Sequence, residues 1–263
     1  MNSIRLWYIY TKIELKKWSE YKLDFLFISL ASMINVLIGI FNIHIVFSKT
    51  EKILEWTEYE VIWMLGYYML VECFFHTFFI NCFDISSWIY NGRLDMLKTR
   101  PRSVIFQLLF SDRYNTEYPI DIFIGSIVLL CWSSSKLIYE WTPMKIGLFV
   151  LAIFFSVIIY SCLIFIISSI SFWTIKSNYL VEFILELEEI NQYPIAAYGN
   201  VVMMVLTYAI PIAFVSFYPC QYFLGHQEYC KFASFMPVIA IILLVLSVIV
   251  WKLGISKYES PNS

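Results

Sequence analysis

Long apolar runs separated by short polar segments constrain this chain more than any other feature of its sequence. A helix rises about 1.5 Å per residue, so a run of roughly 20 apolar residues crosses the hydrocarbon core of a bilayer. Five runs meet or approach that length, at residues 23–47, 61–83, 146–170, 197–217 and 235–251. With 60% hydrophobic and 14% charged residues, the chain has too little polar surface for a soluble globule of its size. The sequence therefore predicts an all-α integral membrane protein, organised as one transmembrane domain over residues 1–263.

A further span between residues 104 and 135 is harder to place. Charged residues interrupt its first half, at Asp112, Arg113, Glu117 and Asp121. The uninterrupted apolar run at residues 122–132 is too short to cross a bilayer alone. One interpretation, which we favour, is a long tilted helix from Val104 to Trp132. The other is a span that begins near Pro119 and continues through residues 133–135. Either one brings the total to six transmembrane helices.

Six spans place both termini on the same side of the membrane, and the basic residues indicate which side. If the N-terminus is cytoplasmic, the inner segments hold thirteen of the eighteen Lys and Arg residues and the outer segments hold five. Cytoplasmic segments are enriched in Lys and Arg. We therefore expect both termini and the polar stretch at residues 84–103 in the cytoplasm, and the loop at residues 220–230 outside. The net charge of −2 does not favour a nucleic-acid partner.

Four segments carry further structural signals. Residues 1–22 combine five basic residues with apolar side chains on one side, which predicts an interfacial helix; an unstructured basic tail is the alternative. Residues 172–194 have the apolar spacing of a second helix, at the inner surface. Pro211 is expected to kink the fifth span. Residues 219–235 are too few to cross and return, so a re-entrant hairpin or short outer helix is expected there.

The sequence contains no motif that would make the chain an enzyme by itself. It has no G-x-x-x-x-G-K-[ST], no H-E-x-x-H, no G-x-S-x-G, and no C-x-x-C or histidine at the spacing of a metal site. Cys220 and Cys230 flank the outer loop and could form a disulfide if that loop faces an oxidising compartment. Transport by such a chain would draw its energy from a partner ATPase or from an ion gradient.

Three polar residues within the apolar runs are candidates for a transport pathway: Asn35, Glu72 and His76. Glu72 and His76 are four residues apart, so both lie on one face of the second span. An ionisable side chain in that position is costly and indicates function, which supports an ion-coupled secondary transporter. The competing interpretation, which we favour, is a mutually satisfied pair at a helix interface, with Asn35 forming interhelical hydrogen bonds.

The polar stretch after the second span carries a recognisable set of motifs. It contains Gly92-Arg93-Leu94-Asp95, followed by Arg100-Pro101, Gln107-Leu108 and Arg113. A second set follows nearer the end of the chain: Glu188-Glu189-Ile190, Tyr193-Pro194, Ile210-Pro211-x-Ala213-Phe214 and Phe217-Tyr218-Pro219-x-x-Tyr222-x-Leu224-Gly225. In this order and topology, the motifs resemble those of type-2 ATP-binding cassette (ABC) transporter permeases, specifically a short six-span bacterial subfamily.

This resemblance implies a division of labour between subunits. The chain would be the permease of an ATP-driven exporter in a bacterial cell membrane, forming half of the pathway with a second permease copy or a related permease. It would bind no cofactor itself, because ATP and Mg would be held by a separate ATP-binding cassette ATPase. Residues 86–103 would form the cytoplasmic coupling helix and loop that dock on that ATPase. The candidate contacts are Gly92, Arg93, Leu94, Asp95, Met96, Leu97, Lys98 and Arg100.

The distribution of charge supports further interpretations, both of the polar stretch and of the transported substrate. Residues 98–103 are more basic than is typical of the family, and a basic loop held by anionic membrane lipids is the alternative to docking. The spans are rich in aromatic residues and poor in charge, which favours an amphipathic substrate such as a peptide, drug or lipid-like molecule. A non-transporting membrane scaffold or immunity protein is the third class of function.

Overall fold

The computed structural model of the chain describes residues 22–101, 103–110, 119–137, 139–174, 179, 182–183, 186, 190–226 and 228–258. The regular structure of these residues is helical, apart from one isolated antiparallel bridge between Ile53 and Trp56. The predicted all-α class is therefore confirmed. The interfacial helix predicted at residues 1–22 lies outside the described residues except for Lys22, and so does most of the surface helix predicted at residues 172–194.

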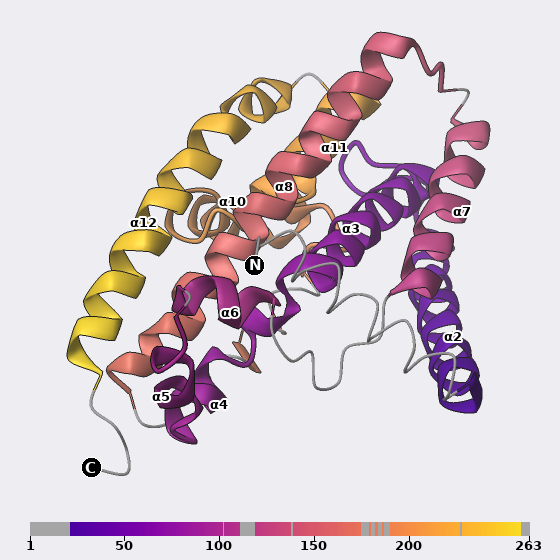
Figure 1. Ribbon diagram of the computed structural model, residues 1–263. Coiled ribbons are helices and arrows are strands. Elements are labelled where there is room, and N and C mark those ends of the chain that lie inside the picture. The colour runs from indigo at the N-terminus through magenta and orange to yellow at the C-terminus, as the bar shows by residue number, and fades with distance from the viewer. Residues whose placement is uncertain are drawn as a thin grey trace.

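Five longer helices form the frame of the molecule (Figure 1). They are α2 (Lys22–Phe47), α3 (Glu58–Phe79), α7 (Ile120–Lys136), α8 (Pro143–Ser169) and α12 (Met236–Lys257). Shorter helices join or flank them: η1 (Ile80–Cys82), α4 (Ile85–Tyr90), α5 (Arg93–Lys98), α6 (Val104–Phe110), η2 (Ile170–Phe172), η3 (Ile195–Tyr198), α10 (Asn200–Met204), η4 (Val205–Ala209), η5 (Ile212–Phe214), α11 (Phe217–Leu224) and η6 (Cys230–Phe235). Of these, η4 is a π-helical turn and the other η elements are 3-10 helices.

Helix α3 lies at the centre of the bundle. Its residues 61–71 are all buried within the chain, because α7, α8, α2 and α11 pack around it. A helix that is apolar on every side is typical of such a position. Helix α12 packs along α8, on the other side of the molecule from α2 and α7 (Figure 1).

Close approach and two buried hydrogen bonds hold α3 to its neighbours. A Cβ at Gly66 would lie 3.1 Å from the Leu129 Cβ atom of α7, which is tighter than ordinary packing allows. The Trp63 indole nitrogen donates to the Ser134 hydroxyl of α7 over 3.1 Å. The Tyr67 and Ser156 hydroxyl oxygens lie 3.0 Å apart, which ties α3 to α8. Such polar contacts between spans are modest in energy but specify which faces meet.

Four helical segments among the described residues are long and apolar enough to cross a membrane. They are Ser29–Phe47, Glu58–Tyr90, Pro143–Phe172 and Cys230–Lys257, which correspond to the first, second, fourth and last predicted spans. A bent pair of helices counts as a fifth segment if both halves belong to one span. Helix α7, with 17 residues, is the element that would complete the predicted six.

The third predicted span begins later than we favoured. Pro119 has non-helical backbone angles, with φ −77° and ψ 57°, and α7 begins at the residue after it. Proline has no N–H to donate and disfavours helical geometry in the residue before it, so a helix running through this position is interrupted. The long helix from Val104 to Trp132 is therefore wrong, and α7 has the bounds of the alternative, which begins near Pro119 and continues through residues 133–135.

The fifth predicted span is broken rather than merely kinked. The segments Asn200–Ala209 and Ile212–Leu224 meet at 84°, with Pro211 between them. The kink expected at Pro211 is confirmed, but one continuous helix over residues 197–217 is wrong. Helix α11 and η6 occupy the segment where a re-entrant hairpin or a short outer helix is expected.

Candidate functional site

A hairpin of two short helices, α4 and α5, follows α3 at one end of the molecule. Its turn contains Gly92, whose φ of 66° lies in the left-handed region that glycine adopts at little cost. Helix α4 packs against the end of α8 and against η2. In Figure 1 the hairpin lies at the bottom of the view, beside the ends of α8 and α12.

The inner side of this hairpin is anchored in the protein core. Leu94 is 0% exposed and Leu97 is 3% exposed, and the two lie on one face of α5. The Gln107 side-chain amide of α6 donates to the Leu97 carbonyl over 3.0 Å. The sequence analysis expected Leu94 and Leu97 to contact a partner; in the structure their side chains face inward and hold α5 in place.

The outer side presents apolar and basic groups together. Tyr90 is 69% exposed and Met96 is 52% exposed, although both are large and apolar. Lys98 and Arg100 are also exposed. Surface-exposed apolar residues of this size beside cations are typical of a protein-binding surface. We call these four exposed residues, Tyr90, Met96, Lys98 and Arg100, the candidate docking surface. The sequence analysis missed Tyr90, whose only signal is an aromatic side chain directly before a polar turn.

Two predicted contact residues have structural roles within the hairpin. The Arg93 guanidinium lies over the Trp88 ring, 4.9 Å from the ring centroid, which is a cation–π contact between α5 and α4. Asp95 is half-buried. Both side chains therefore belong to the frame of the hairpin as well as to its surface.

The pathway candidates do not form one site. Glu72 Oε1 and His76 Nε2 lie 3.8 Å apart on α3, with both side chains about a quarter exposed. The two atoms are close enough for an ion pair but too far apart for a hydrogen bond. Asn35 is exposed on α2, a helix that contacts the rest of the chain along only a small part of its surface.

The predicted disulfide is absent. Cys220 and Cys230 are not joined in the structure, and Cys220 is fully buried within α11. Proximity in sequence suggested the pair, but the helical geometry of α11 turns the Cys220 thiol into the core. Among the described residues, no group of three or more His, Cys, Asp or Glu side chains could hold a metal ion.

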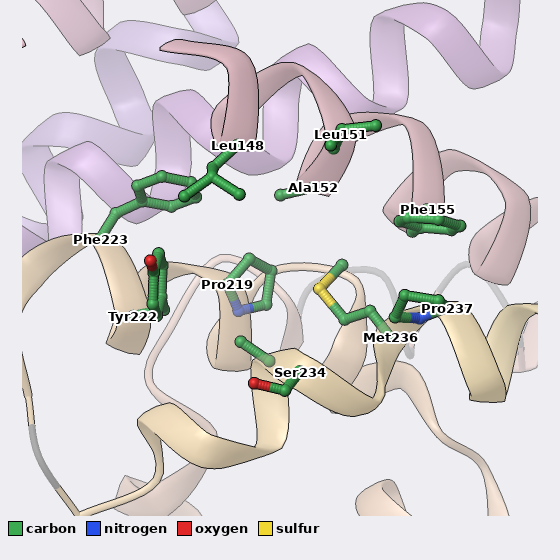
Figure 2. A pocket seen from close by; sticks show the side chains of 11 residues that line it. Leu148, Leu151, Ala152, Phe155, Pro219, Tyr222, Phe223, Ser234, Met236 and Pro237 are labelled. Atoms are coloured by element: carbon green, nitrogen blue, oxygen red, sulfur yellow. The ribbon is translucent and has the colours of Figure 1, made fainter. Parts of the chain in front are cut away.

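An apolar pocket of about 250 Å³ opens between α8, α11, η6 and α12. Figure 2 shows its wall on α8, formed by Leu148, Leu151, Ala152 and Phe155, facing Pro219 and Met236 across the cavity. Tyr222 and Ser234 supply its hydroxyl groups. A pocket with such a lining accepts an apolar group and can orient it by a few polar contacts.

These features define a class of protein. An all-helical chain with several membrane-crossing helices, a two-helix hairpin at one end and an apolar pocket between its helices is a multi-pass membrane protein.

The comparison with protein families specifies the class further. The family model described as ABC-2 family transporter protein matches residues 33–262, so the chain belongs to this family. The resemblance identified in the sequence is thereby confirmed. The chain is a permease component of an ABC transporter, and the family implies an ABC ATPase as its partner in general. Comparisons with curated proteins and with solved structures gave no match.

Proposed function

We propose that this chain is the permease subunit of an ATP-driven exporter, and that a separate ATP-binding cassette subunit drives it by docking on the α4–α5 hairpin. The chain forms half of the translocation pathway, and a second copy or a related permease forms the other half. ATP and Mg²⁺ bind to the partner subunit. The observation that carries the proposal is the pairing of an anchored inner face, Leu94 and Leu97, with an exposed docking surface on the same short helices.

The composition of the docking surface suits a groove on a partner protein. Tyr90 and Met96 would fill an apolar floor, while Lys98 and Arg100 would meet acidic groups at its rim. Aromatic residues, Met and Arg are enriched at protein interfaces, and a few buried anchors carry most of the binding energy. Coupling to the ATPase also requires a rigid hairpin, because a flexible loop would deform instead of transmitting the movement to the spans.

The mechanism follows from how the hairpin is attached. Closure of the ATPase on ATP moves the hairpin as a body, and α4 carries this movement to α8, against which it packs. The transporter then has two states, which differ in how the spans pack along the pathway. The population shifts from one state to the other because the contacts differ between the two states. The excess of Lys and Arg in the inner segments supports a bacterial plasma-membrane orientation with both termini and the hairpin in the cytoplasm.

The substrate class follows from the pocket. Its lining is apolar apart from a few hydroxyl groups, so it suits the apolar part of an amphipathic peptide, drug or lipid-like molecule rather than a polyanion. The pocket lies where α11 and η6 meet the membrane-crossing helices α8 and α12.

The test is a pull-down of the tagged chain in mild detergent from its native host, with ATPase activity measured on the eluate. We expect wild type to retain an ATPase and the double variant Tyr90→Ala, Met96→Ala to lose about tenfold or more of it. The matched control is Met144→Ala with Tyr208→Ala, which removes equally exposed side chains elsewhere and should retain the ATPase. Retention by the Tyr90, Met96 variant rules out this docking surface, and absence of an ATPase from wild type overturns the proposed function.

A further inference from the structure

Three aromatic side chains connect the α5 helix to the last membrane-crossing helix. We call Phe172, Trp251 and Tyr258 the aromatic clamp. The ring centroids of Tyr258 and Phe172 are 6.1 Å apart, and those of Phe172 and Trp251 are 5.3 Å apart, both in edge-to-face geometry. Offset and edge-to-face arrangements are the favourable ones for aromatic pairs. The clamp therefore joins η2, α12 and the residue that follows α12.

The clamp is packed without spare volume. A Cβ at Gly254 would collide with the Phe172 ring, so α12 approaches η2 as closely as a backbone without a side chain permits. Trp251 is 3% exposed and also contacts Phe165 of α8, with ring centroids 5.2 Å apart. The ends of α8 and α12 are consequently locked to each other through these rings.

Helix α5 reaches this clamp through a charged contact. The Lys98 ammonium lies over the Tyr258 ring, 4.2 Å from the ring centroid. Burial, and then the nearby Asp95 carboxylate, raise the pKa of the Tyr258 phenol above its ordinary value, which places both α5 side chains beside one ring. A cation over an aromatic face is attracted by the ring quadrupole. Tyr258 therefore brings the clamp into contact with α5.

We propose that Tyr258 is a positioning residue that holds α5 against the ends of α8 and α12, so that movement of the docking hairpin is transmitted to the last membrane-crossing helix. The clamp itself is a property of this chain; its role in transmission rests on the proposed function. The sequence analysis ended the last apolar run at residue 251, whereas α12 continues to Lys257 and Tyr258 directly follows it.

The first experiment tests the clamp on the full-length chain without any ATPase. Spin labels are placed at the exposed positions Thr99→Cys and Lys252→Cys, with Cys131 and Cys230 changed to Ser, and the label-to-label distance distribution is measured. We expect a narrow distribution for wild type and for Tyr258→Phe, which keeps the ring, and one about twofold broader for Tyr258→Leu. Tyr208→Leu, which removes a 75% exposed ring, is the control and should leave the distribution narrow.

A second variant gives a result even if Tyr258→Leu misfolds. Lys98→Met leaves the clamp packed and removes only the cation over Tyr258, so it should broaden the distribution even if Tyr258→Leu does not fold. A distribution that stays narrow in both Tyr258→Leu and Lys98→Met overturns the clamp.

The second experiment tests transmission in the complex with the ATPase. The reaction rate of Lys231→Cys with a membrane-impermeant maleimide is measured with and without ATP, with Cys131 and Cys230 again changed to Ser, because Lys231 is exposed on η6, the element that directly precedes α12. We expect ATP to change this rate in wild type and in Tyr258→Phe, and to leave it unchanged in Tyr258→Leu although the ATPase copurifies equally with all three. An equal response to ATP in Tyr258→Leu overturns transmission through Tyr258. Failure of wild type to bring down an ATPase instead overturns the proposed function and leaves the first experiment to decide the clamp.

Discussion

The His226 imidazole stacks on the Trp56 indole, with ring centroids 4.7 Å apart and planes 25° from parallel. The imidazole Nε2 also lies 3.3 Å from Glu60 Oε1, and Thr57 donates both its backbone N–H and its hydroxyl to the other oxygen of the same carboxylate. These contacts fasten the segment after α11 to the loop that precedes α3. The Thr57–Glu60 bonds are a local capping box at the start of α3. The His226 contacts instead join residues more than 160 positions apart in the sequence, and no local pattern indicates them.

We expect His226→Ala to destabilise the protein by about 1–3 kcal/mol, because it leaves a mostly buried carboxylate without one of its partners. The measurement is thermal or denaturant unfolding in detergent. His44→Ala is the matched control: His44 Nδ1 lies only 2.9 Å from Glu58 Oε1, but its side chain is 64% exposed, so its loss should cost about 1 kcal/mol or less. Equal losses from both variants would contradict this assignment.

A methyl group at Gly66 should weaken the packing of α3 on α7. Its Cβ would approach the Leu130 backbone nitrogen to 3.2 Å, and a backbone atom cannot turn aside as a flexible side chain can. We expect Gly66→Ala to cost about 1–3 kcal/mol, measured by the same unfolding assay. Gly147→Ala on α8 is the control, because a Cβ there meets nothing within 4 Å and alanine favours the helix.

Gly92→Ala should distort the α4–α5 hairpin and reduce the amount of ATPase that copurifies. The left-handed backbone at this position costs a residue with a Cβ about 1–2 kcal/mol. Gly92→Asn tolerates the left-handed region better, so it should retain most of the ATPase. Equal recovery with Gly92→Ala and wild type would show that the turn geometry does not matter for docking.

Filling the apolar pocket should interfere with substrate rather than with docking. Ala152→Trp projects a large ring from α8 into the cavity shown in Figure 2. We expect lower labelling by a photoreactive probe with an alkyl chain, while the ATPase still copurifies. Ala197→Trp adds the same ring at an exposed position on η3 and is the control. Undiminished labelling of Ala152→Trp would remove this pocket from the pathway.

Helices whose position depends on their own composition could be predicted from the sequence. The first, second, fourth and last spans were placed to within seven residues at each end, because long apolar runs leave a chain no alternative to a buried or membrane-crossing helix. The family motifs around residues 92–101 fall in the α4–α5 hairpin, although the sequence analysis expected one coupling helix and a loop over residues 86–103 rather than two helices. In hindsight, the three-residue spacing of Leu94 and Leu97 indicates a shared face, which could have marked them as anchors.

Features that depend on contacts between distant residues were decided by the tertiary structure. A charge count could not show that α7 begins after Pro119, or that Pro211 separates two segments meeting at 84°. The direction in which Cys220 points, the exposure of Tyr90 and the contact of Lys98 with Tyr258 likewise depend on how α5, α11 and α12 pack. The sequence by itself determined an all-α membrane chain of the ABC-2 type, because apolar length and local motifs are properties of neighbouring residues. Only the folded chain decided which side chains anchor a helix, lie exposed or form the aromatic clamp, because each of those features is a relationship between residues that packing alone brings together.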